Sequence, residues 1–292
     1  MRARRGYGLR TSRLYNPLVI SVEILIIGNE VLLGQVQDTN SNYLCRVIRG
    51  RGGLVRQIAV VRDEIDAIAD AVKASRGRRA GLIFTCGGLG PTDEDLTLAG
   101  IAKGTGRKLE SNQPARDFIE SRYAELASAG FVESSEMTEA RLKMALLPAG
   151  AVAVDNPIGS APAVTLQAGD SRIVALPGVP DELKAIVEGP LQALLHEIFG
   201  PGCYREREIT VACGDESQLA PVLREVTAAH PNVYIKSRAS HFGQDVRFRV
   251  IVSASASSAE KANRLIEAAS GEVCRLFQKV GIGCTAQPAE DL

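Results

Sequence analysis

The sequence has no tryptophan, only three histidines and no cysteine pair in CxxC spacing among its 292 residues. Structural zinc sites need clustered cysteine and histidine ligands, so the sequence argues against one. The formal net charge is zero, so no overall field favours nucleic acid or a membrane surface. No apolar run reaches the roughly 18 residues of a membrane span, and no secretory signal is visible. We therefore expect a cytoplasmic protein with no membrane partner.

Strand and helix patterns alternate between residues 22 and 105. This alternation predicts an α/β domain with a mostly parallel sheet sandwiched by helices. The expected strands are Val22–Ile27, Leu54–Val61 and Gly81–Thr85, and the expected helices are Asn40–Gly50, Glu64–Arg76 and Glu94–Thr105.

The next segment, residues 112–145, has a charged helical pattern and few strand signals. We expect this insertion to pack on the core through Phe118, Tyr123, Leu126 and Phe131. The strands Ala163–Leu166 and Ile173–Leu176 flank a turn signal and predict a hairpin. A helix is expected to begin near Pro180 and to continue to Ile198.

Gly200-Pro201-Gly202 is the best linker candidate, and the pattern changes beyond it. The expected elements are strand Glu206–Ala212, helix Ser217–Ala229, strands Val233–Ser237 and Val246–Ser253, and helix Ala259–Val280. This βαββα order predicts a small, KH-like α+β domain, but the GxxG loop that clamps nucleic acid is missing, so no nucleic-acid partner is expected. We predict a basic, disordered extension over residues 1–20, a large domain over 21–200 and a small domain over 203–284.

A glycine loop follows the third expected strand. Gly87, Gly88 and Gly90 lie between this strand and the helix expected near Glu94. Backbone N–H groups and the positive end of a helix dipole make such a junction an anion site. The acidic run Asp93-Glu94-Asp95 follows at once, and its carboxylates are suited to a divalent cation. The pattern indicates a phosphorylated ligand bound together with a metal ion such as Mg²⁺.

A second glycine loop follows the first expected strand, over Gly28-Asn29-Glu30-Val31-Leu32-Leu33-Gly34, and Asp38-Thr39-Asn40 comes next. Open α/β sheets bind ligands in the crevice at the carboxyl ends of their strands. We therefore expect the two loops to form one site.

These motifs recur in one order with Asn156-Pro157-Ile158-Gly159-Ser160-Ala161-Pro162 and Leu176-Pro177-Gly178-Val179-Pro180-Asp181-Glu182-Leu183. Together they resemble the N-terminal region of the competence/damage-inducible protein A (CinA) family, whose core is the molybdopterin-binding (MoaB/MogA-like) fold. The resemblance is strong over 22–200 and weaker over 205–280. We do not expect the nicotinamide mononucleotide deamidase domain that full-length CinA proteins add at the C-terminus, because these 292 residues leave no room for it.

The resemblance implies two functions. One is metal-dependent hydrolysis of the pyrophosphate of ADP-ribose or of a related dinucleotide such as FAD. The alternative is a molybdopterin-binding protein of molybdenum-cofactor metabolism. Both bring a small nucleotide or pterin ligand to one crevice, so the fold alone does not choose between them.

Carboxylates are the candidate catalytic groups. Asp93 and Asp95 are the best metal ligands, with Glu30 or Asp38 completing the shell, and Glu182 is a general base or further ligand. Each has a structural alternative: Asp38 and Asp93 as helix caps, and Glu182 as a favourable charge at a helix start. The candidate ligand contacts, including Lys108 against phosphate charge, are Gly28, Asn29, Gly34, Asn40, Gly87, Gly88, Gly90, Thr92, Lys108, Asn156, Gly159, Ser160, Pro177 and Gly178.

Ser160 lacks a G-x-S-x-G context, which argues against a serine hydrolase. Cys86 is expected to be a buried strand residue and not a reactive thiol. A disulfide such as Cys213–Cys274 is compatible with the sequence, which does not fix a pairing. We expect a homodimer.

Overall fold

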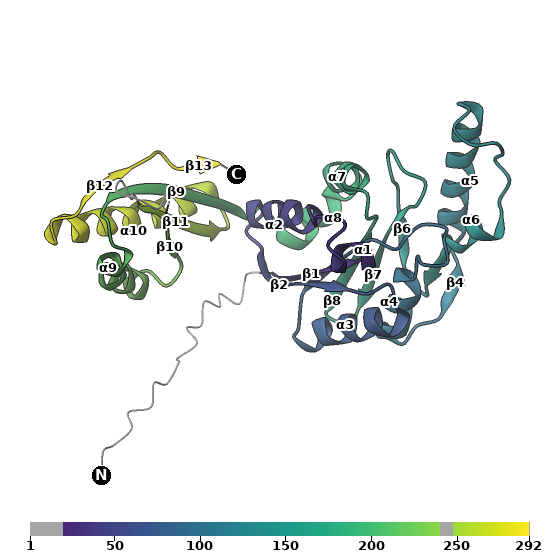
Figure 1. The fold of residues 1–292 in the computed structure, drawn as a ribbon, viewed down its shortest axis with the longest axis horizontal. Helices are drawn as coiled ribbons and strands as arrows, with labels where there is room; N and C mark the ends of the chain where they lie inside the picture. Colours follow the sequence, from purple (N-terminus) through teal and green to yellow (C-terminus); the bar gives the residue numbers. More distant parts are fainter. Residues whose placement is uncertain (1–19, 240–247, 292) are drawn as a thin grey trace, which may run out of the picture. The chain divides into compact units, whose positions relative to one another are not determined.

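The computed structural model describes residues 20–239 and 248–291. The chain divides into two compact units, with the boundary between Cys203 and Tyr204 (Figure 1). The predictions for residues 1–19 and for a strand start at Val246 lie outside the described residues.

A six-stranded sheet in the order β2-β1-β3-β8-β7-β6 is the centre of the larger unit. The strands are β1 (Ser21–Ile27), β2 (Leu54–Val61), β3 (Leu82–Cys86), β6 (Val152–Val154), β7 (Ala163–Ala168) and β8 (Ser171–Leu176). Neighbours among β2, β1, β3 and β8 are parallel, and β7 is antiparallel to both of its neighbours. The predicted mostly parallel sheet and the β7–β8 hairpin are confirmed.

Helices cover both faces of this sheet (Figure 1). One layer holds α2 (Asn40–Gly50), α7 (Pro180–Glu188) and α8 (Gln192–Phe199), and the other holds α3 (Ile65–Gly77), α4 (Thr97–Thr105) and α5 (Gln113–Ser128). Alternation along β1 explains the two layers, because Ile24 and Ile26 pack toward α2 while Leu25 and Ile27 pack toward α3.

Some boundaries differ from the prediction. The helix expected from Glu94 begins three residues later, at Thr97, because Thr92 and Asp95 close a turn that delays it. The helix expected over 180–198 is interrupted after Glu188 by Gly189-Pro190, which separates α7 from α8. The short helix α1 (Asn29–Leu32) was not predicted.

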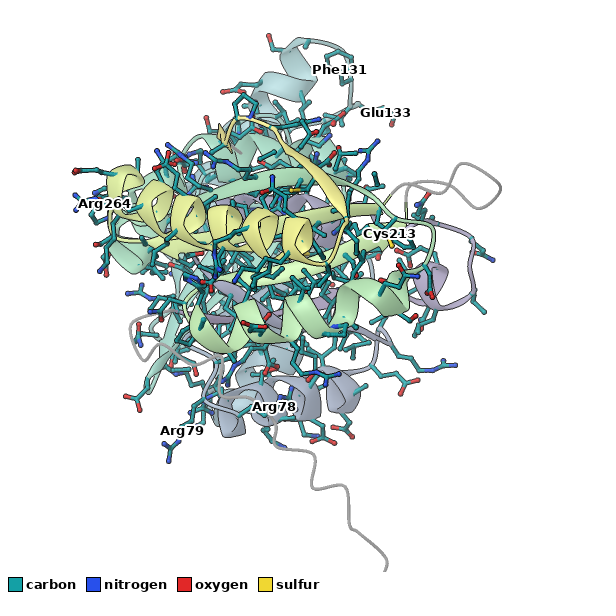
Figure 2. The ribbon with its side chains drawn as sticks, turned by 90° about the vertical axis from the view of Figure 1, so that its left-hand side faces the viewer. Arg78, Arg79, Phe131, Glu133, Cys213 and Arg264 are labelled. Atoms are coloured by element: carbon teal, nitrogen blue, oxygen red, sulfur yellow. The ribbon has the colours of Figure 1, made fainter. Side chains whose placement is uncertain are left out.

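The insertion consists of α5, α6 (Glu139–Lys143) and the paired strands β4 (Leu109–Ser111) and β5 (Leu146–Pro148). Phe118, Tyr123 and Leu126 pack on the core as predicted. The prediction for Phe131 is wrong: this side chain is 78% exposed, because the turn after α5 carries it away from the core (Figure 2).

The smaller unit has a sheet in the order β10-β11-β9-β12, with β13 also paired to β9. Its elements are β9 (Cys203–Ala212), α9 (Glu216–Ala229), β10 (Tyr234–Ala239), β11 (Phe248–Ala256), α10 (Ala259–Lys279), β12 (Gly283–Ala286) and β13 (Glu290–Asp291). The described residues thus follow the predicted βαββα order, with two added strands. None of the described helices combines the length and the apolar character needed to cross a membrane.

Candidate functional site

The loops that follow β1, β3 and β8 lie at one edge of the large sheet, because these strands are parallel neighbours. The segment before the antiparallel strand β7 reaches the same edge. Two hydrogen bonds join the loops directly. The Gly87 N–H donates to the Leu176 carbonyl over 3.0 Å, and Asn40 Nδ2 donates to the Gly178 carbonyl over 2.8 Å. The Gly87 backbone also lies against the carbonyl of Ile27, the last residue of β1, so the two glycine loops begin next to each other as expected.

The glycine loop after β3 is too tightly packed for side chains. Gly87 and Gly88 have φ angles of 107° and 65°, in the left-handed region that favours glycine. A Cβ on Gly87 would lie within 3.0 Å of the Ile27 carbonyl, and one on Gly88 within 3.0 Å of Thr97 Oγ1. The Thr97 hydroxyl in turn donates to the Gly87 carbonyl over 2.7 Å. The loop is thereby fixed between the end of β1 and the start of α4.

Helix α4 begins at this loop with Leu96 as its N-cap, and no side chain caps it. Its first-turn N–H groups therefore have no side-chain acceptor, and the positive end of the helix dipole lies beside the glycine loop. Asp93 does not cap the helix, because the helix starts four residues beyond it. The Thr97 N–H already donates to the Gly88 carbonyl over 3.2 Å, so an anion at this position would use the later N–H groups of the first turn, without competition from a capping carboxylate.

The acidic turn before α4 is closed on itself. Asp95 Oδ2 accepts hydrogen bonds from the Thr92 N–H over 2.8 Å and from the Thr92 hydroxyl over 2.7 Å. Lys143 of the insertion donates to the Thr92 carbonyl. Thr92 and Asp95 therefore shape the loop, whereas the side chain of Asp93 is exposed.

The loop after β1 is held by a carboxylate that the sequence analysis missed. Asp63 Oδ2 accepts the Asn29 N–H over 2.6 Å. Asn29 Oδ1 is buried and has no hydrogen-bond partner among the described residues. Asp63 comes two residues after β2, so the rule that ligand sites lie at the carboxyl ends of strands was the available signal.

Asp38 has a structural role at the start of α2, as its alternative interpretation proposed. Its carboxylate accepts the Ser41 N–H over 2.9 Å and also the Ser41 hydroxyl, at the start of α2. Burial and the nearby Asp38 charge together raise the pKa of both Cys45 and Cys86. Cys86 is buried as expected, and its raised pKa disfavours the reactive thiolate.

The predicted metal ligands Glu30, Asp38, Asp93 and Asp95 do not form a ready-made cluster. In the part of the chain that the structure describes, no three His, Cys, Asp or Glu side chains are grouped so as to hold a metal ion. The local reason is that Asp38 is hydrogen-bonded to Ser41 in the first turn of α2 and Asp95 closes the Thr92 turn. A metal ion at this edge would therefore need further ligand atoms, from water or from a bound molecule.

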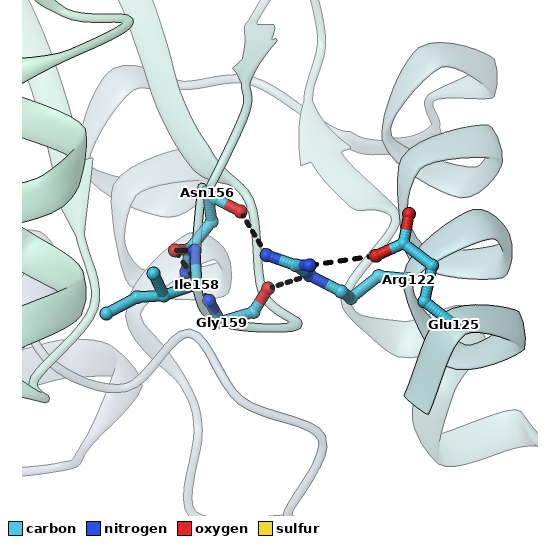
Figure 3. Close-up of polar contacts among 5 residues, drawn as sticks. All are labelled: Arg122, Glu125, Asn156, Ile158 and Gly159. Atoms are coloured by element: carbon cyan, nitrogen blue, oxygen red, sulfur yellow. Dashed lines mark hydrogen bonds and ion pairs between the residues drawn. The ribbon is translucent and has the colours of Figure 1, made fainter. Parts of the chain in front are cut away.

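Besides the loops after β1 and β3, the site includes a turn that the Asn156 side chain holds in place (Figure 3). The Asn156 side chain is buried and its four hydrogen-bonding positions are used. Oδ1 accepts the N–H groups of Ile158 and Gly159, and Nδ2 donates to the Ala161 carbonyl and to Glu182 Oε2 over 2.8 Å. Asn156 therefore holds the Glu182 carboxylate in place and has no capacity left to contact a ribose or base.

Arg122, on the insertion helix α5, fixes the same turn from outside. Its guanidinium donates to the Gly159 carbonyl over 2.9 Å and to the Asn156 carbonyl over 3.0 Å, and it also pairs with Glu125 (Figure 3). No local sequence pattern indicates this role, because the contact joins residues more than thirty positions apart.

Other predicted contacts occupy different positions. Lys108 lies beyond the far end of the nine-residue helix α4, about 13 Å along the helix from the glycine loop, which removes it from the phosphate position. Gly34 occupies an exposed turn with φ 71° and open space around it. Pro177 is buried below the exposed Gly178, and Ser160 is half-buried in the Asn156 turn.

The sheet between two helix layers, with glycine loops at its carboxyl edge, has the architecture of the open α/β ligand-binding class. The family model described as "Probable molybdopterin binding domain" matches residues 23–197. The chain belongs to this family.

Two curated relatives match most of the chain. The protein from Pyrobaculum calidifontis is 35% identical over 256 residues, covering 87% of this chain and 95% of the relative. One from Aeropyrum pernix is 36% identical over 263 residues, covering 89% and 92%. Both alignments are longer than the family match.

A solved structure supports the same assignment. The protein CinA from Thermoplasma acidophilum, described as having unknown function, is similar with a TM-score of 0.54 and 30% identity, over 60% of this chain and 98% of that one. The predicted CinA-like fold with a molybdopterin-binding domain is confirmed.

Proposed function

We propose that the carboxyl edge of the large sheet binds a small phosphorylated pterin of the molybdopterin type. The observation that carries this proposal is the glycine loop Gly87–Gly88, fixed in left-handed backbone beside the start of α4, which no side chain caps. Backbone N–H groups at such a junction bind phosphate. The family match supports the pterin as the remainder of the ligand.

Two hydrogen-bond acceptors at this edge of the sheet suit the donors of such a ligand. Asn156 orients Glu182 through one carboxylate oxygen, and Asn29 Oδ1 is a buried acceptor without a partner among the described residues. An unpaired buried acceptor is unfavourable unless a donor arrives. A pterin ring carries N–H donors, which could form hydrogen bonds with the Glu182 carboxylate and with Asn29 Oδ1.

Hydrolysis of ADP-ribose or FAD is the second candidate, and two acidic side chains favour it. Glu30 and Asp93 are exposed at the loops after β1 and β3. Mg²⁺ is commonly bound by one or two carboxylates together with substrate phosphates. A preformed three-ligand cluster is therefore not required, and exposed carboxylates of these loops, such as Glu30 and Asp93, would contribute to holding the ion.

The pterin proposal is tested by titrating molybdopterin into the protein and into two glycine variants. Gly88 and Gly106 flank α4 at opposite ends and have similar φ angles of 65° and 69°. Gly88→Ala places a methyl group at the loop, whereas Gly106→Ala meets open space. Both substitutions strain the backbone, but only Gly88→Ala should weaken binding, by tenfold or more. Equal binding by the two variants, or no binding by the native protein, would contradict the proposal.

The hydrolase candidate needs a separate assay. Native protein and Asp93→Asn are incubated with ADP-ribose or FAD, with and without Mg²⁺, and AMP is measured. AMP that requires Mg²⁺ and disappears in Asp93→Asn supports hydrolysis. Molybdopterin binding without AMP release supports the binding protein alone.

A further inference from the structure

Strand β2 is an open edge of the large sheet. It has β1 on one side and, among the described residues, no strand on the other. Its eight residues therefore present a row of outward backbone N–H and C=O groups. Open edges of this length are ready to pair with another strand.

Apolar side chains surround this edge. The register shift between β1 and β2 at Arg56 places Ile58 opposite Ile24 and Val60 opposite Ile26, on the α2 side of the sheet. Helix α2 leaves both uncovered, so that Ile58 is 45% and Val60 36% exposed. Helix α1 packs on the same face through Val31. We define the β2 edge patch by its five exposed apolar residues, Leu32, Leu33, Val36, Ile58 and Val60.

The second half of β2 lacks the usual protection of an edge strand. Soluble proteins protect open edges with charged residues, proline, β-bulges or very short strands, and β2 has one charge and one bulge, both at Arg56. After Arg56, β2 continues as Gln57-Ile58-Ala59-Val60-Val61, without a charge or a proline. The opposite edge strand, β6, has only three residues. The two edges of the sheet are thus unequal, and β2 is the one suited to an interface.

We propose that the β2 edge patch is a homodimer interface, in which β2 pairs antiparallel with β2 of a second copy about a two-fold axis. A two-fold interface brings one surface against itself, so an apolar strand edge is self-complementary. Charge also permits this partner. The chain has zero net charge. A register with Ile58 opposite its own copy puts Arg56 opposite Val60 and Arg62 opposite Leu54, so like charges do not face each other. This inference does not depend on which ligand the site binds.

The test is the molar mass in solution, measured by light scattering and sedimentation. Native protein should have twice the 31.1 kDa chain mass. Val60→Lys and Ile58→Lys should each return it to one chain mass, because a buried charge opposes pairing. Val152→Lys is the matched control, since Val152 is an exposed valine on the other edge strand, and it should remain dimeric.

A monomeric native protein overturns the proposal, and so does a dimer that survives both β2 substitutions or dissociates in Val152→Lys. A substitution could also abolish the dimer by unfolding the protein. Hydrogen exchange of the native protein avoids this problem, because it needs no substitution. Backbone amides of residues 54–61 should exchange more slowly as the native protein is concentrated, and those of 152–154 should not change. Exchange in residues 54–61 that is independent of concentration would place the interface elsewhere.

Discussion

Replacing Gly159 with alanine tests whether the Asn156 turn holds the Glu182 carboxylate. The φ angle of Gly159 is not in the left-handed region, so alanine causes no backbone strain of that kind. The added Cβ would instead lie within 3.0 Å of Glu182 Oε2 and Asn156 Nδ2. One of these groups must move, and the hydrogen bond between them must stretch or break.

The magnitude follows from the groups involved. A hydrogen bond to a charged group contributes about 1.5–3 kcal/mol, and overpacking a well-filled site costs about 1–3 kcal/mol. The loss of unfolding free energy is smaller than the sum of these two contributions, because Glu182 is half-buried and its carboxylate can bind water instead. We therefore expect Gly159→Ala to lower the free energy of unfolding by about 2–4 kcal/mol.

Urea unfolding followed by circular dichroism measures this loss. Gly77→Ala is the control, because Gly77 is the last residue of α3 and a Cβ there meets nothing within 4 Å. The control should be neutral or slightly more stable, since alanine favours helix. A Gly159→Ala midpoint equal to that of the native protein would refute the tight contact between the turn and Glu182.

Three further results are expected elsewhere in the large unit. Glu23→Gln should lower the free energy of unfolding by about 1–2 kcal/mol, below the usual range for a buried pair because its partner Arg78 is 42% exposed. Burial tends to raise the pKa of Glu23, but hydrogen bonds from Arg78 and Ser75 and the Arg78 charge bring it below its usual value. The native protein should therefore lose this stabilisation as the pH falls from about 4.5 through the lower folded-state pKa, and Glu23→Gln should show a shallower loss in acid unfolding curves. Cys86 should resist iodoacetamide at pH 8 until urea unfolds the protein, as mass spectrometry of the labelled peptides would show; labelling at the rate of a free thiol would contradict its burial.

The sequence by itself determined the local elements and the order of the motifs. Apolar strands such as Leu54–Val61 were placed correctly, because a short β-branched run has few other favourable conformations. The glycines of the loop after β3 were found because the close backbone approach and positive φ require glycine. Parallel pairing then follows from the strand–helix alternation, which places the loops at one edge.

Only the tertiary structure decided what the polar side chains do. Aspartate can cap a helix, close a turn or bind a metal ion, and sequence spacing does not separate these roles. In the folded protein, Asp38 accepts the Ser41 N–H at the start of α2, and Asp95 accepts the Thr92 N–H and closes a turn. Contacts made across the fold, from Arg122 to the Asn156 turn and from Asp63 to Asn29, leave no periodic signal in the chain. The open edge of β2 depends equally on strand order, because its apolar pattern would also suit a strand buried within the sheet.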